Sequence, residues 1–219
     1  QLVQESLMGI FILDPIPSMM RNYSRIGDAS LRRNCSNVSS VLYALKTSKE
    51  WPDFVKTITQ LPENEIKGID FVTTPLNDVI LVQKEQNGNA IANMDAPRLS
   101  DGTLRCMALL AAVMSEPKNS VIAIEELDNG IHPSRARKLM DVLSQIAKRR
   151  GIDLIITTHN VTLLNSLSKE DVLGVSIVYR DASTNVSRII PFVDVQNQAA
   201  ILASGGIGDA LESDSILRA

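Results

Sequence analysis

The chain has 219 residues and a formal net charge of −3, with 44% hydrophobic and 21% charged residues. This length accommodates one large domain or two small ones with a substantial core, and the composition is ordinary for a soluble globular protein. The slightly negative charge excludes a global positive field that would draw the chain onto nucleic acid, although a local basic patch is compatible with it.

The sequence predicts a cytoplasmic protein. Cys35 and Cys106 lie far apart and lack the spacing of a metal site, so we expect reduced thiols. The longest wholly apolar run, residues 107–114, is too short to span a bilayer, and the first five residues lack the features of a signal peptide. Because the chain does not begin with Met, we expect it to be a piece of a longer protein.

The first hundred residues predict short elements and an antiparallel region. The apolar run 8–13 is stopped by two prolines, and segments 38–45 and 53–61 have the pattern of short helices. Between residues 66 and 96, β-prone side chains flank Asn87-Gly88, a strong turn signal. We therefore expect antiparallel strands with a hairpin there.

From Ser100 onward the pattern predicts a parallel α/β arrangement. A helix follows Ser100, and the continuous apolar run 121–124 is typical of a strand covered on both faces. Residues 133–150 predict a helix with proline in its first turn and glycine directly after its end. Residues 154–156 and 172–179 predict a second buried strand and a third strand. The spacing is that of a βαβ unit with a right-handed crossover.

The first chemical motif is the helix start at residues 99–105. A helix N-terminus offers free backbone N–H groups and a partial positive charge, which suit a phosphate. Ser100 adds a hydroxyl, and Gly102 allows the backbone to approach a ligand closely. The alternative is an ordinary N-cap, with Ser100 or Asp101 capping a core helix.

Two acidic residues and two histidines lie at the ends of the predicted strands or next to them. Glu125 and Glu126 end the apolar strand, and open α/β sheets bind ligands at that edge. The alternative is a strand that simply ends in solvated acids. His159 follows the next strand, where an imidazole could donate to a phosphoryl oxygen, and His132 precedes the predicted helix 133–150. Structural roles near helix and strand ends are the alternative for both histidines.

Together these segments resemble an ABC-type ATPase head of the SMC/RecF/OLD branch. The resemblance implies an α/β fold: a three-layer P-loop NTPase with a parallel core sheet, plus an antiparallel β/helical region. The implied divisions are residues 1–98, the remainder of an N-terminal lobe with the helical and antiparallel region, and residues 99–219, the lobe with the motifs. The segments that resemble the ABC signature, Walker B motif, D-loop and H-loop are 99–105, 121–126, 127–133 and 155–160.

The resemblance also implies roles for single residues with ATP and Mg²⁺. Glu125 would hold Mg²⁺, through water, and Glu126 would polarise the attacking water, while His159 would contact the γ-phosphate. The family commonly has aspartate in place of Glu125, which affects the metal geometry. Leu127 stands where the family often has proline.

In this family ATP closes a dimer, and the signature of one protomer covers the ATP of the other. Ser100, Asp101 and Gly102 would therefore act on the partner's nucleotide. Asn129 and His132 would communicate across the dimer. A homodimer or a higher homo-oligomer is implied.

No G-x-x-x-x-G-K-[ST] string occurs in the 219 residues. In ABC heads this phosphate loop precedes the signature, so we expect it upstream of Gln1, in an N-terminal lobe that this chain lacks. The chain alone is then expected not to bind ATP tightly.

The segments most resemble ATPases of antiphage defence systems of the Septu and retron-associated kind, which implies a nuclease or other effector partner. DNA repair or chromosome maintenance is the alternative process.

A non-hydrolysing, nucleotide-sensing scaffold that restrains an effector is a further alternative. DNA binding is a third, since four arginines form a basic stretch, although such a run is usually a solvated face. These arginines are Arg21, Arg25, Arg32 and Arg33. No membrane association is expected.

Overall fold

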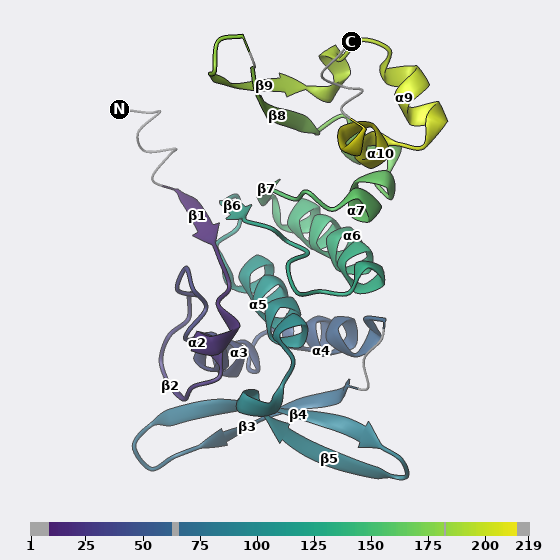
Figure 1. Ribbon diagram of the computed structural model, residues 1–219. Coiled ribbons are helices and arrows are strands. Elements are labelled where there is room, and N and C mark those ends of the chain that lie inside the picture. The colour runs from purple at the N-terminus through teal and green to yellow at the C-terminus, as the bar shows by residue number, and fades with distance from the viewer. Residues whose placement is uncertain (1–8, 63–65, 182, 214–219) are drawn as a thin grey trace. The chain divides into compact units, whose positions relative to one another are not determined.

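The computed structural model describes residues 9–62, 66–181 and 183–213 (Figure 1). The chain forms two compact units, one ending at Thr157 and the other beginning at Thr158. The lobe boundary expected after residue 98 falls within the first unit and stays a prediction. Among the described residues, no helix has both the length and the apolar character needed to cross a membrane.

The first unit contains a three-stranded parallel sheet in the order β1-β6-β7. Its strands are β1 (Ile10–Leu13), β6 (Val121–Ile124) and β7 (Asp153–Ile156). Leu13, Ile124 and Ile156 are in register across the sheet, so all three strands end at one edge. Helix α6 (Pro133–Arg150) connects β6 to β7, which confirms the predicted strand–helix–strand unit.

The two faces of this sheet differ in exposure. Side chains alternate along a strand, and on one face Leu13, Ile122 and Ile124 are at most 1% exposed. On the opposite face Ile12 is 41% exposed and Ile155 is 52% exposed. The expectation that both faces are covered, and that 154–156 is a buried strand, is therefore wrong for this sheet. Continuous apolar sequence predicted burial, but the described elements leave one face open to solvent.

Helix α5 (Asp101–Ser115) forms the centre of the first unit. Twelve of its fifteen residues are buried, so it is apolar around its whole circumference rather than along one stripe. It packs against α6 and against two shorter helices, α3 (Val38–Leu45) and α4 (Trp51–Gln60). The short helix α2 (Pro17–Met20) also contacts α5.

The ends of the helices agree with the predicted signals, with one difference. α6 begins at Pro133, and Gly151 follows its end with a φ of +69°, as expected for a left-handed cap. α3 has the predicted bounds. α4 begins at Trp51, two residues before the predicted start at Asp53, because Pro52 lies in the first turn, where proline is tolerated.

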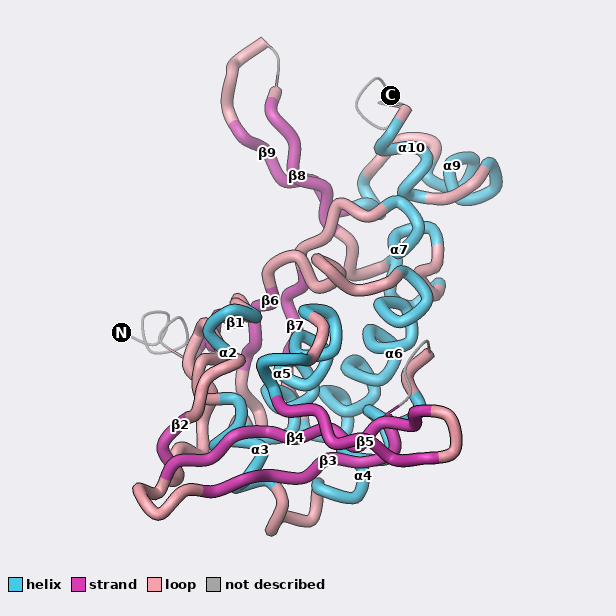
Figure 2. Tube along the Cα trace, turned by 60° about the horizontal axis from the view of Figure 1, so that its bottom comes forward, coloured by secondary structure: helices cyan, strands magenta, loops and turns pink. Residues whose placement is uncertain are grey.

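The predicted antiparallel region is confirmed (Figure 2). It consists of β2 (Ser24–Arg25), β3 (Ile66–Thr73), β4 (Asp78–Asn87) and β5 (Ala90–Asp95). β4 pairs with the other three strands. Gly88 forms the turn between β4 and β5 with a φ of +58°, as the Asn-Gly signal indicates. The 3₁₀ turn η1 (Ala96–Arg98) then leads into α5.

The second unit has its own small core, in which Phe192 is 0% exposed and Ile207 1% exposed. Its strands β8 (Ser176–Arg180) and β9 (Ser187–Pro191) pair antiparallel with each other. The remaining elements are α7 (Val161–Asn165), α8 (Lys169–Val172), η2 (Phe192–Asp194), α9 (Gln198–Ser204) and α10 (Ile207–Glu212).

The strand predicted at residues 172–179 is partly wrong. Val172 ends α8, whose start is capped by Ser168 through a 3.1 Å hydrogen bond from the Asp171 amide to Ser168 Oγ. A local side-chain cap therefore favours a helical turn before the chain enters β8.

Candidate functional site

Three carboxylates follow the carboxyl ends of two neighbouring strands. Asp14 comes directly after β1, and Glu125 and Glu126 come directly after β6. The Glu125 amide donates to the Leu13 carbonyl at 3.3 Å, which continues the ladder one residue past the strands. Parallel pairing of β1 with β6 thus brings the acidic residues to the same edge of the sheet.

These side chains line a cavity of about 290 Å³, called the acidic cavity below. Its lining residues are Asp14, Arg105, Glu125, Glu126, Asn129 and Thr157. Three of them, Glu125, Glu126 and Asn129, are residues that the sequence singled out, and the structure brings these three together. Of the other three, Asp14 directly follows β1, Arg105 lies in the second turn of α5 and Thr157 directly follows β7.

Glu126 adopts an unusual backbone conformation at this edge. Its φ is +45°, in the left-handed region that costs a non-glycine residue about 1–2 kcal/mol. Hydrogen bonds surround it: its amide donates to Thr157 Oγ1 at 3.0 Å, and its carbonyl accepts from the Asn129 amide at 3.0 Å. Asn129 Nδ2 also donates to Glu126 Oε2 at 3.3 Å. Such conformations persist where the surroundings hold them, often at functional sites.

The start of α5 is an N-cap, as the simpler interpretation of the sequence expects. Ser100 Oγ accepts a hydrogen bond from the Thr103 amide at 3.1 Å. Asp101, the first residue of the helix, pairs with Arg21 at 2.6 Å. The proposed contact of Ser100 and Asp101 with a phosphate stays a prediction.

Gly102 is buried against the segment that follows β6. A Cβ placed on Gly102 would lie 2.5 Å from the Gly130 carbonyl oxygen, closer than real Cβ atoms approach. The first turn of α5 and the D-loop-like segment therefore touch within one chain. Glycine is required here for the close approach of two backbones.

Arg105 and Arg33 bring positive charge to the acidic residues. Arg105 lines the acidic cavity, and Arg33 Nη2 lies 3.9 Å from Glu125 Oε1. Both partners of the Arg33–Glu125 pair are more than half exposed, so it contributes between 0 and about 1 kcal/mol to stability. Arg21 and Arg32 are also in ion pairs, with Asp101 and Asp28, so three of the four arginines of the basic stretch face carboxylates.

The two histidines occupy different places. His132 is the N-cap residue of α6, and its ring Nδ1 lies 3.0 Å from Ser134 Oγ. It is exposed and does not line the acidic cavity. His159 belongs to the second unit, where it is exposed directly before Asn160, the cap of α7.

The donor set of the acidic cavity fits a hard cation that keeps much of its own hydration. Carboxylate, amide and hydroxyl oxygens are ligands that Mg²⁺ accepts, usually from one or two carboxylates together with water and phosphate oxygens. Within the described ranges no three Asp, Glu, His or Cys side chains converge as a metal cage.

Asp14, Arg105 and Thr157 were not expected in the site, although the sequence carries a signal for two of them. Asp14 repeats the pattern of Glu125, an acid directly after an apolar run, and Thr157 directly follows the apolar run 154–156. Arg105 gives no local signal, because its approach to the cavity depends on how α5 packs beside the sheet.

The parallel sheet with an acidic carboxyl edge defines the class: an α/β nucleotide-binding fold of the ABC ATPase-head type. A solved structure supports the fold, the SmcHead bound to the C-winged helix domain of ScpA, with a TM-score of 0.52 and 12% identity over 83% of this chain and 55% of that chain. Residues 40–165 match the family described as "AAA domain, putative AbiEii toxin, Type IV TA system", and the chain belongs to this family.

Curated relatives agree with this class. The "Probable ABC transporter ATP-binding protein p29" of Mycoplasma genitalium is 24% identical over 156 residues, which are 71% of this chain and 61% of the relative. The "Lipoprotein-releasing system ATP-binding protein LolD" of Syntrophus aciditrophicus is 30% identical over 71 residues, 32% of this chain and 31% of the relative. The chain thus spans less than two thirds of either relative.

Proposed function

We propose that the chain is part of an ABC-type ATPase that binds and hydrolyses ATP with Mg²⁺. The observation that carries this proposal is the meeting of Glu125 and Glu126 with Asp14, Arg105 and Thr157 in one cavity at the carboxyl edge of a parallel sheet. Ligands of open α/β sheets bind at this edge, and phosphoryl transfer needs a carboxylate to position water and another to hold the metal.

Within one protomer, Glu126 is the residue that orients and polarises the attacking water. Its hydrogen bonds with Asn129 and Thr157 fix the backbone from which the carboxylate projects. Glu125 would hold Mg²⁺, whose chemistry is to neutralise charge on the phosphate oxygens. Arg105 adds a positive charge at the same cavity, and His159 would donate to the γ-phosphate.

Across a dimer, the first turn of α5 would cover the partner's nucleotide. Ser100, Asp101 and Gly102 form this turn, and the N-terminus of a helix favours an anion. Asn129 and His132 lie on either side of Gly130, which contacts Gly102. In this proposal they contact the partner protomer and respond when the dimer closes or opens. The support is the direct packing of this turn on the segment 127–133 in a single chain.

The open sheet face supports a further part of the proposal, that a lobe carrying the phosphate loop packs there. Parallel sheets are covered on both faces in nearly all α/β proteins. Ile12 and Ile155, at 41% and 52% exposure, lie opposite the covered face. Burying them would remove apolar surface from water and complete a three-layer arrangement.

The process that this ATPase serves is proposed to be antiphage defence, with a nuclease or other effector as partner and in the cytoplasm. This follows from the resemblance of the motif segments, and the family description names a toxin of a type IV system. DNA repair or chromosome maintenance is the competing process. Phage plating efficiency on cells with the intact gene or with Glu126→Gln tests the choice: equal plating on both would reject defence.

A non-hydrolysing sensor is the second candidate, favoured by Glu125, which is longer than the aspartate common at this position and faces Arg33. The two candidates differ in turnover. Full-length protein is incubated with ATP and Mg²⁺, and released phosphate and dimer formation are followed in the same samples. Turnover together with dimerisation supports the ATPase, whereas dimerisation without phosphate release supports the sensor.

A further inference from the structure

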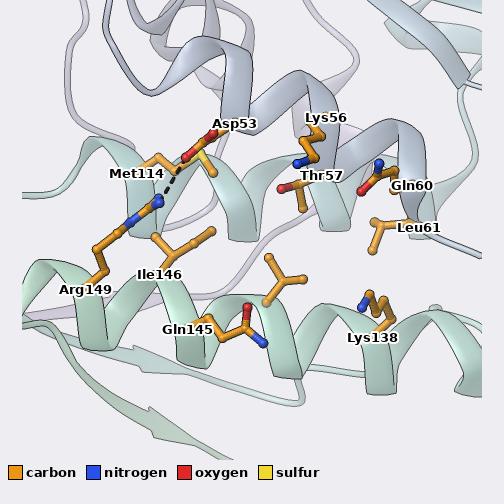
Figure 3. Close-up of a pocket in the computed structure, with 11 residues that line it drawn as sticks. Asp53, Lys56, Thr57, Gln60, Leu61, Met114, Lys138, Gln145, Ile146 and Arg149 are labelled. Carbon is orange, nitrogen blue, oxygen red and sulfur yellow. Dashed lines mark hydrogen bonds and ion pairs between the residues drawn. The ribbon is translucent and has the colours of Figure 1, made fainter.

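A cleft of about 470 Å³ lies between α4 and α6, outside the acidic cavity (Figure 3). Side chains from both helices project into the space between them. The polar residues of this α4–α6 cleft are Asp53, Lys56, Thr57 and Gln60 from α4 and Lys138, Gln145 and Arg149 from α6.

The cleft is shaped like a helix-binding groove. On α4 the lining positions are 53, 56, 57 and 60, and on α6 they are 138, 142, 145, 146 and 149. Spacings of three and four residues place each set on one face of its helix. The α4 wall runs from 53 to 60, seven steps that rise about 10 Å at 1.5 Å per residue, or about two turns of a bound helix. The two sets of side chains face each other across the cleft (Figure 3).

The floor of the cleft is apolar. Leu61, Met114 and Ile146 lie beneath the polar rim and are 4%, 2% and 6% exposed. Val142 also lines the cleft and is half-buried. Val142 and the small exposed part of this floor suit an apolar side chain better than a phosphate backbone.

The rim is positively charged. Lys56, Lys138 and Arg149 oppose a single carboxylate, Asp53, which leaves an excess of two positive charges (three minus one). Arg149 Nη1 pairs with Asp53 Oδ2 at 3.0 Å and spans one end of the cleft. In the described part of the chain neither Lys56 nor Lys138 has an ion-pair partner, so both ammonium groups are available to an anionic ligand.

We propose that the α4–α6 cleft binds an acidic amphipathic helix of a partner protein. An apolar side chain of that helix contacts Val142 and the exposed edges of Leu61 and Ile146. Carboxylates on its flanks pair with Lys56 and Lys138. Charge complementarity selects the partner and speeds its association, and the apolar contact adds to the affinity. This site is independent of ATP hydrolysis and requires no residue of the acidic cavity.

The test uses a displayed library of helix-forming peptides, about 18 residues long, selected on the full-length protein. Enriched peptides are synthesised, and their affinities are measured by fluorescence anisotropy. Two double variants are compared with the wild type: Lys56→Glu with Lys138→Glu, and Lys49→Glu with Arg137→Glu. The second pair is exposed, does not line the cleft and makes the same change in net charge. Circular dichroism confirms that all three proteins fold.

The expected peptides carry apolar residues at helical spacing flanked by Glu or Asp. Their affinity should fall at least about tenfold in the cleft variant and stay unchanged in the control. Enrichment of peptides without acidic residues, or equal binding to both variants, overturns the proposal. A single-stranded oligonucleotide that displaces the peptides and loses affinity in the cleft variant alone would instead assign the cleft to nucleic acid. Self-association of the wild type that only the cleft variant lacks would assign it to a second copy of the chain.

Discussion

The first turn of α5 and the segment after β6 meet at two glycines: a Cβ on Gly102 would lie 2.5 Å from the Gly130 carbonyl oxygen. This contact joins the helix start that we propose covers the partner's nucleotide to the segment that we propose senses the dimer interface. Asn129, which directly precedes Gly130, also hydrogen-bonds to Glu126, so the contact is linked to the proposed catalytic carboxylate through one residue.

Gly102→Ala is expected to lower stability by about 2 kcal/mol, because the added methyl group must displace backbone rather than a flexible side chain. For a chain of this size that is a fall of several degrees in Tm, measured by calorimetry. Gly68→Ala is the matched control, since a Cβ there would lie 3.8 Å from Lys84 Cδ, an ordinary contact. Equal Tm values for the two variants would contradict the close packing at Gly102.

Glu126→Gln is expected to reduce ATP turnover of the full-length protein by about 10²- to 10⁴-fold, the usual contribution of a positioned general base. ATP-dependent dimerisation should persist. The Gln side chain keeps an oxygen that accepts from Asn129 Nδ2, so we expect an unchanged Tm. An unchanged Tm would exclude a folding defect as the cause of the lost turnover. Phosphate release and sedimentation measure the two properties, and normal hydrolysis by the variant would remove Glu126 from the mechanism.

The features that were predicted correctly are those that depend on residues adjacent in the sequence. The run 121–124, the proline that begins α6 and the glycine that ends it are local signals, and the structure confirms the elements they indicate. The same holds for the Ser100 cap. Glu125 and Glu126 were found because they directly follow an apolar strand.

Features that depend on distant contacts were missed. Asp14 joins the acidic cavity because β1 pairs with β6, more than a hundred residues later in the chain. Arg105 reaches it because of the packing of α5. Likewise, the exposure of Ile155 follows from which side of the sheet the helices cover, and an apolar run carries no information on that.

Asp14→Asn is expected to raise the Mg²⁺ concentration for half-maximal ATP turnover by about tenfold, because it removes one of three carboxylates that line the acidic cavity. Turnover at saturating Mg²⁺ should change much less. Asp153→Asn removes the same charge from the opposite end of β7 and should leave the Mg²⁺ dependence unaltered. A Mg²⁺ titration in which Asp14→Asn follows the wild-type curve would place Asp14 outside the metal site.

Because two cysteines are buried, we predict that the folded state loses stability at high pH. Burial raises the pKa of the Cys35 and Cys106 thiols to about 12, against the lowering effects of Arg105 on the first and Arg135 on the second. In the unfolded chain both thiols titrate near about 8.5. Between these values the folded state keeps protons that the unfolded state releases, so stability falls as the pH rises, by up to about 1.4 kcal/mol per pH unit for each thiol.

Urea unfolding at several pH values between about 8 and 10, which spans the unfolded pKa of a thiol, measures this slope. The double variant Cys35→Ala with Cys106→Ala should be less stable at pH 8 yet lose less stability as the pH rises, since it has no thiols to titrate. Other groups that titrate in this range, such as Lys and Tyr, change the free energy of unfolding equally in the wild type and the variant. Their contribution therefore cancels when the two pH dependences are subtracted. Parallel stability curves for the wild type and the variant would show that the thiols ionise alike in the folded and unfolded chain, and so are not buried as the structure has them.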